Sequence, residues 1–155
     1  MSQLEQALQL IQANQDQGYF VGPRGEPLIR AAETALGLAF PPTYRRFLAE
    51  LGCGDIAGAE FYGLIDDNFA SGSVPNGIWL TLKLRNTNLL PPSLVVVSDI
   101  GDGGYYAIDT SQRDSQGENP IVAWYPGLSK PEVSPEKVSD DFGAFILQRI
   151  SEALQ

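Results

Sequence analysis

The sequence predicts an α+β fold in which a mostly antiparallel sheet packs with N-terminal helices and a C-terminal helix. Three observations support this prediction: helical spacing of apolar residues near both ends, short strand-like runs in the middle, and hairpin-type turns between those runs. Strands in hairpin order, without β-α-β alternation, favour an antiparallel sheet with helices on one side. The 155 residues can bury one core, so we expect a single domain over 1–155.

Three helices are expected before the first strand. In the first, at 3–13, apolar residues recur at three- and four-residue steps after a Ser-x-x-Glu capping box. A loop at 16–27, rich in glycine and proline, separates it from a second helix at 27–37. The third helix, at 41–52, begins at a Pro-Pro pair, which suits a helix N-terminus, and stops at a glycine.

Strands dominate the second half of the predicted order. A short strand is expected at 59–65, and the segment 77–86 fits either a strand or a helix; we favour the helix because Asn76 is a good N-cap. Three further strands are expected at 93–99, 104–109 and 120–125. A final helix is expected at 139–154, capped by Ser139 and with two aspartates in its first turn.

The composition is acidic, with 19 Asp and Glu against 10 Lys and Arg and a net charge of −9. Such a chain has little with which to neutralise phosphates, which argues against DNA or RNA as a direct ligand. The charge favours a basic partner and a fast electrostatic encounter with it. Acidity that serves only solubility is the alternative interpretation.

Histidine is absent and cysteine occurs once, at Cys53. This excludes Ser-His-Asp and Cys-His catalysis, a His-ligated metal, a zinc-cysteine site and a disulfide within the chain. We expect no cofactor and no metal, and we interpret Cys53 as a small buried hydrophobe. The N-terminus has no basic segment followed by an apolar one, and no apolar run approaches membrane-spanning length, so we expect a cytoplasmic protein.

The Asp-Ile-Gly-Asp-Gly-Gly run at 99–104 places carboxylates at its first and fourth positions. A calcium loop needs them at its first, third and fifth positions, and a phosphate loop needs a lysine after the glycines, so a hairpin turn is the better interpretation. Five aspartates could include a general acid/base pair, but the sequence does not place two of them at catalytic distance. We assign no catalytic residue. Trp124, in a buried strand, is expected in the core.

Four short motifs follow one another in a fixed order: Glu-x-x-Leu-Gly, Phe-Pro-x-x-Tyr-x-x-Phe-Leu, Gly-x-Gly and Phe-x-Gly-Leu. They fall on these residues: Glu33, Leu36, Gly37, Phe40, Pro41, Tyr44, Phe47, Leu48, Gly52, Gly54, Phe61, Gly63 and Leu64. This order resembles the SUKH superfamily, which is named for yeast cell-wall (glucan synthesis) regulators of the Smi/Knr type. The similarity runs from about residue 28 to the end of the chain.

The resemblance implies an α+β fold whose motif residues form a framework and not an active site. Bacterial members are mostly immunity proteins that bind and block a cognate polymorphic or contact-dependent toxin domain, often a nuclease. A regulatory or scaffold role related to cell-wall synthesis is the second hypothesis, and a carboxylate-based hydrolase is the third. The residues expected to bind the partner lie in acidic loops around the sheet: Asp66, Asp67, Asp99, Asp102, Tyr105 and Asp109.

Overall fold

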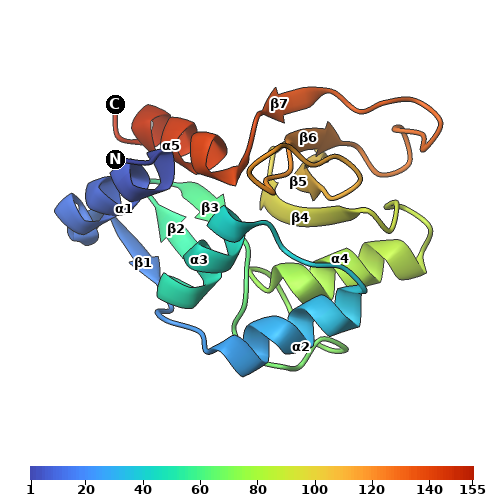
Figure 1. Cartoon of the computed structure of the whole chain (residues 1–155), viewed down its shortest axis with the longest axis horizontal. Coiled ribbons are helices and arrows are strands. Elements are labelled where there is room, and N and C mark those ends of the chain that lie inside the picture. The colour runs from blue at the N-terminus through green and yellow to red at the C-terminus, as the bar shows by residue number, and fades with distance from the viewer.

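The computed structural model describes residues 1–155 and contains five α-helices and seven strands (Figure 1). The helices are α1 (Gln3–Ala13), α2 (Glu26–Leu36), α3 (Pro42–Glu50), α4 (Gly77–Asn86) and α5 (Phe142–Ala153), with a short 3-10 helix η1 (Gln15–Gln17). The strands are β1 (Gly18–Phe20), β2 (Gly54–Ile56), β3 (Ala59–Phe61), β4 (Leu94–Asp99), β5 (Tyr105–Asp109), β6 (Ile121–Trp124) and β7 (Lys137–Ser139). The predicted α+β class is confirmed.

The strands form two antiparallel sheets, one in the order β1-β2-β3 and the other in the order β4-β5-β6-β7. Contacts near the end of β3 connect them, because the Tyr62 amide donates to the Val97 carbonyl (2.7 Å) and the Ser98 hydroxyl donates to the Glu60 carbonyl (2.6 Å). Figure 1 shows α1, α3 and α5 around the smaller sheet, and α2 and α4 beneath β4. None of the helices is long and apolar enough to span a membrane.

The elements that the sequence did not predict are the shortest strands. β1 lies inside the predicted loop 16–27, and β2 and β7 lie in segments where no strand was expected. Each has three residues, which is too few for a period-two pattern to emerge, so their pairing depends on the neighbouring strand. The strand expected at 59–65 is also shorter, because β3 ends at Phe61.

Capping hydrogen bonds define the starts of α4 and α5. Asn76 caps α4, as expected, and its side-chain oxygen accepts from the amides of Ile78 and Trp79. The expectation that Ser139 caps the last helix is wrong. Ser139 pairs with β6 as the end of β7, and Asp141 caps α5 by accepting the Ala144 amide at 2.8 Å.

Two apolar clusters form the core, and the alternation of side chains along β5 connects them. The larger cluster lies among α1, α2, α3, α5 and the inner faces of both sheets, and includes the aromatic residues Phe40, Tyr44, Phe47, Phe61, Phe142 and Phe145. The smaller cluster lies between α4 and the four-stranded sheet and includes Trp124, as expected. Ile108 of β5 belongs to the larger cluster and Ala107 to the smaller one, so this sheet is covered on both faces.

Glycines of the Gly-Cys-Gly segment allow two backbones to cross. Gly52 has a left-handed φ of 74° after α3, and its carbonyl accepts the Leu64 amide at 3.0 Å. A Cβ at Gly63 would collide with that same carbonyl. Glycine at these two positions is therefore required by the packing of α3 against the segment after β3.

Candidate functional site

The structure places the predicted binding residues in three separate regions. Asp99, Asp102 and Tyr105 lie together on the β4–β5 hairpin. Asp66 and Asp67 lie on the exposed loop between β3 and α4. Asp109 lies at the opposite end of β5 from Tyr105. Four residue steps along the strand separate them, or about 13 Å at about 3.3 Å per step.

The hairpin turn holds its two aspartates through hydrogen bonds to its own backbone. A carboxylate oxygen of Asp99 accepts the Gly101 amide at 2.6 Å, and one of Asp102 accepts the Gly104 amide at 3.2 Å. The Ile100 amide closes the turn on the Gly104 carbonyl at 3.0 Å. Both aspartates remain exposed, so the turn presents two fixed negative charges to solvent.

Tyrosines lie beside these charges. Tyr105 pairs with Asp99 across the hairpin, and the Tyr125 hydroxyl donates to the second carboxylate oxygen of Asp102 at 3.2 Å. Tyr62 is buried beneath them, with 3% of its surface exposed. Burial raises the pKa of Tyr62, and the nearby charges of Asp99 and Glu60 raise it further, so all three side chains share one electrostatic environment.

Glu60 was missed by the sequence analysis although it lies at this site. It is the exposed residue of β3, between buried Ala59 and Phe61. Alternation over the longer strand expected at 59–65 was the only signal that could have placed it outward. Its charge and that of Asp99 both act on Tyr62, and this arrangement depends on the contact between the two sheets, which no local pattern encodes. We define the acidic hairpin surface by five residues: Glu60, Asp99, Asp102, Tyr105 and Tyr125.

The other predicted residues differ in their exposure. Asp66 and Asp67 are exposed, and a carboxylate oxygen of Asp66 accepts the Asn68 amide at 3.0 Å. Asp109 is only 4% exposed. Its carboxylate accepts the amide and hydroxyl of Ser111 (3.0 and 2.6 Å) and the side-chain amide of Gln112 (3.2 Å), so it organises the loop after β5.

Tyr105 and Asp109 lie on the same face of β5, because side chains two residues apart in a strand point the same way. Helix α4 packs on that face, and the smaller apolar cluster fills the space between them. Tyr105 lies at the edge of this cluster, half-buried. On this sheet, the exposed predicted residues therefore lie at its hairpin end and not on its face.

The remaining reactive groups are structural. Cys53 is fully buried, and burial raises the pKa of its thiol to about 11. Glu118 is 7% exposed and accepts the amide and hydroxyl of Thr43 (3.1 and 2.6 Å), which fixes the loop after β5 to the first turn of α3. The structure has no group of three or more His, Cys, Asp or Glu side chains placed to hold a metal ion.

Comparison with known proteins identifies the scaffold. No curated protein matches the chain. The family model described as SMI1-KNR4 cell-wall, SUKH_6, matches residues 26–146, from the first residue of α2 into α5. The matched span contains the acidic hairpin surface and the crossing of Gly52 and Gly63, and it covers well over half of the chain. This chain belongs to the SMI1-KNR4 family within the SUKH superfamily.

Proposed function

We propose that this protein is a non-enzymatic immunity protein that acts in the cytoplasm and binds and neutralises a cognate toxin domain. The observation that carries the proposal is the acidic hairpin surface, in which exposed carboxylates surround half-buried tyrosines on a SUKH scaffold. The turn fixes both aspartates before a partner arrives, which lowers the entropy cost of binding.

The chemistry of this surface suits a basic protein partner. Carboxylates steer a cationic surface into place, and partly buried tyrosines supply apolar contact area with a polar tip. A nuclease must carry basic groups to hold phosphates, and a protein with a net charge of −9 can mask them. We therefore propose a toxin domain with a basic surface, a nuclease being the best example.

The predicted residues then take different roles. Asp99, Asp102 and Tyr105 form the centre of the proposed contact, together with Glu60 and Tyr125. Asp66 and Asp67 form a second exposed acidic segment for the rim of the interface. We propose that Asp109 supports the neighbouring loop and does not touch the partner, because its carboxylate is buried and hydrogen-bonded.

The test is calorimetric titration with the protein encoded immediately upstream of this gene, at low and high salt. The double variant Asp99→Asn/Asp102→Asn removes two charges but keeps an oxygen that can accept the Gly101 and Gly104 amides. We expect binding about tenfold weaker, mainly through slower association. The matched control Asp16→Asn/Glu132→Gln removes two exposed charges outside the acidic hairpin surface. Equal effects of both double variants would show that only net charge matters, and not this surface.

The family description provides one reason to consider a second function, since it refers to the cell wall. In that case the same surface would recruit a component of cell-wall synthesis as a regulatory or scaffold protein. A tagged pull-down from the native cell separates the two possibilities. Recovery of a toxin domain supports immunity, and recovery of a cell-wall enzyme without any toxin supports the scaffold role.

A further inference from the structure

The smaller sheet has one open edge, at β1. This strand pairs only with β2, in the register Gly18–Ile56, Tyr19–Asp55 and Phe20–Gly54. The Ala57 amide donates to the Gln17 carbonyl (2.8 Å), and the Val21 amide donates to the Cys53 carbonyl (3.0 Å).

Hydrogen bonds of an antiparallel pair alternate along each strand. Residues 17, 19 and 21 therefore bond to β2, whereas the N–H and C=O groups of Gly18 and Phe20 point away from it. Four backbone groups, two donors and two acceptors, line the open edge. Such an edge is a template for another strand.

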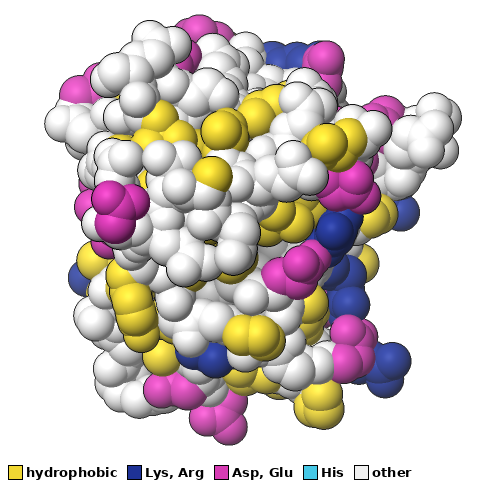
Figure 2. All heavy atoms as spheres, turned by 90° about the vertical axis from the view of Figure 1, so that its left-hand side faces the viewer, with side chains coloured by type: hydrophobic (Ala, Val, Ile, Leu, Met, Phe, Trp, Pro, Cys, Tyr) yellow, Lys and Arg dark blue, Asp and Glu magenta, His cyan; other side chains and the backbone are white.

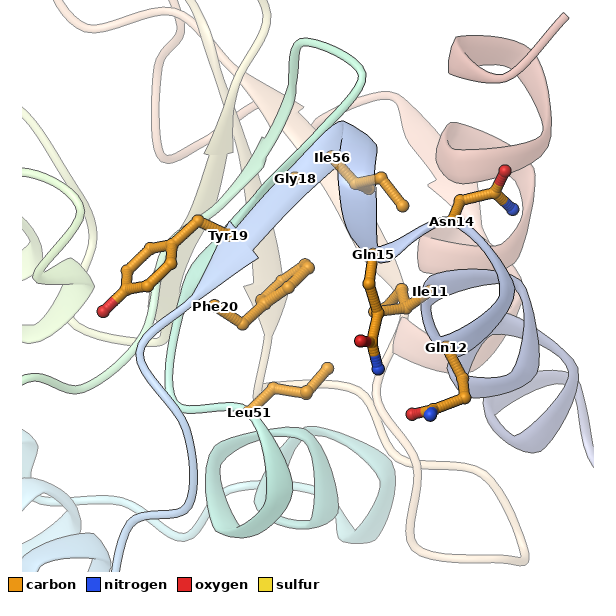
Figure 3. Close-up of a pocket in the computed structure, with 9 residues that line it drawn as sticks. All are labelled: Ile11, Gln12, Asn14, Gln15, Gly18, Tyr19, Phe20, Leu51 and Ile56. Atoms are coloured by element: carbon orange, nitrogen blue, oxygen red, sulfur yellow. The ribbon is translucent and has the colours of Figure 1, made fainter.

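A hollow of about 290 Å³ borders this edge (Figure 3). Its apolar lining consists of Ile11, Phe20, Leu51 and Ile56, and the polar residues Gln12, Asn14 and Gln15 also line it. Figure 3 shows the side chain of Tyr19 pointing away from Ile11 and Leu51, so this residue borders the hollow through its backbone. None of the nine lining residues is charged.

The charge of the protein limits which of its surfaces could meet a second copy. Two copies with a net charge of −9 repel each other wherever their acidic surfaces meet. Figure 2 shows the side of the molecule that carries α1 and β1, with uncharged and hydrophobic atoms over most of its centre and charged groups mainly toward the rims. Neither β1 nor the hollow carries a charge, so the nearest like charges within the sheet are the exposed Asp55 carboxylates on β2, one strand away from the edge.

We propose that two copies of this chain pair through β1, antiparallel, about a two-fold axis at Tyr19. Gly18 then lies opposite the partner's Phe20, and the N–H of each bonds to the C=O of the other. The symmetric pair repeats this exchange, so all four open groups of each copy are satisfied in four hydrogen bonds. The fit is self-complementary because the same two residues supply both donors and acceptors.

Side chains support the same pairing. Tyr19 is 68% exposed, which is large for an aromatic residue, and on the two-fold axis it faces the partner's Tyr19 across the two strands. The two three-stranded sheets become one six-stranded sheet, and the two hollows lie on the same face of it. The acidic hairpin surface lies mostly on the other sheet. Its one residue on this sheet, Glu60, belongs to β3, and β2 separates β3 from the paired edge, so the pairing leaves the proposed toxin contact free.

The first test is sedimentation velocity over a concentration series of the full chain and two matched variants. Tyr19→Lys places like charges opposite each other at the two-fold axis, while its exposed position preserves the fold. We expect the unmodified protein to form a dimer, and we expect the dissociation constant of the Tyr19→Lys dimer to be at least about tenfold higher. Gln6→Lys makes the same charge change at an exposed position of α1 outside the hollow and should dimerise like the unmodified chain.

The second test is amide hydrogen exchange at low and high protein concentration. The Tyr19 amide bonds within the monomer and should be protected at both concentrations, whereas the Gly18 and Phe20 amides should gain protection only in the dimer. A monomer at every concentration overturns the proposal and leaves the edge available to a strand of another protein. A dimer that Tyr19→Lys does not weaken, with both amides still unprotected, also overturns it.

Discussion

The carboxylate of Glu33 provides a quantitative test of how α2 and α3 are held together. It accepts hydrogen bonds from Nε and a terminal nitrogen of Arg45 (3.1 and 2.7 Å) and from the Phe40 amide (2.7 Å), and its side chain is only 15% exposed. Arg45 also binds Glu26 at 2.9 Å. One arginine thus joins the start and the end of α2 to α3.

The substitution Glu33→Gln removes the charge and replaces one acceptor oxygen with a donor that faces Arg45. Hydrogen bonds to charged, partly buried groups contribute about 1.5–3 kcal/mol, and Arg45 keeps Glu26, so we expect a loss of about 2.5 kcal/mol in the free energy of unfolding. For a protein of this size that corresponds to a Tm lower by about 8 °C. The control Glu50→Gln breaks an exposed i,i+4 pair with Arg46 and should cost less than about 0.5 kcal/mol.

The assay is urea unfolding of the three proteins between pH 7 and pH 3. Hydrogen bonds from Arg45 lower the pKa of Glu33 below its ordinary value of 4.5. A lowered folded pKa contributes stability that is present above the unfolded value and lost as the pH falls through the folded one. The difference between Glu33→Gln and the unmodified protein should therefore shrink below about pH 4.5. A cost at pH 7 no larger than that of Glu50→Gln would refute the reasoning.

Three further predictions follow from buried groups. Gly63→Ala should lower the free energy of unfolding by about 1–3 kcal/mol, because its Cβ would meet the Gly52 carbonyl. Gly143→Ala should raise it by about 0.5–1 kcal/mol, because Gly143 lies in α5 and an added Cβ would make only ordinary contacts. Denaturant titration of both variants measures the two changes. The raised pKa of Cys53, about 11, predicts no reaction with a thiol reagent at pH 8 in the native protein and one equivalent after unfolding. Burial raises the pKa of Glu118 above 4.5, so its contribution to stability is lost as the pH rises through the folded value. Glu118→Gln should therefore be at least as stable as the unmodified protein at pH 7. Glu118→Ala leaves Thr43 unpaired and should lower the free energy of unfolding by about 2 kcal/mol, as measured by thermal unfolding.

Local sequence signals were sufficient for the helices. A capping side chain and apolar residues at three- and four-residue steps stabilise a helix through contacts within about four residues, as Ser2 and Asn76 show. The one helix start that was predicted wrongly, at Ser139, depended on a distant residue, because Ser139 pairs with Ile121 of β6 and so belongs to β7. The same reason explains the three short strands, which exist only because another strand lies beside them.

The candidate site was predictable only in part. The Asp-Gly turn signal placed Asp99 and Asp102 on a hairpin, because the two residues are close in the chain. The sequence could not show that the charges of Glu60 and Asp99 act on the same tyrosine, Tyr62. Ser98 donates to the Glu60 carbonyl next to them, and these two residues are 38 positions apart in the chain. Nor could it show that the carboxylate of Asp109 is buried and accepts hydrogen bonds from the loop after β5.

By itself the sequence determined the fold class, the helix positions, the acidity and the family, because these depend on composition, local periodicity and short motifs in a fixed order. Only the tertiary structure decided which charges share a surface, which edge stays open and which carboxylates are buried. These properties arise from contacts between segments far apart in the chain. They are set by packing and by backbone groups that must find partners, and no stretch of sequence contains both sides of such a contact.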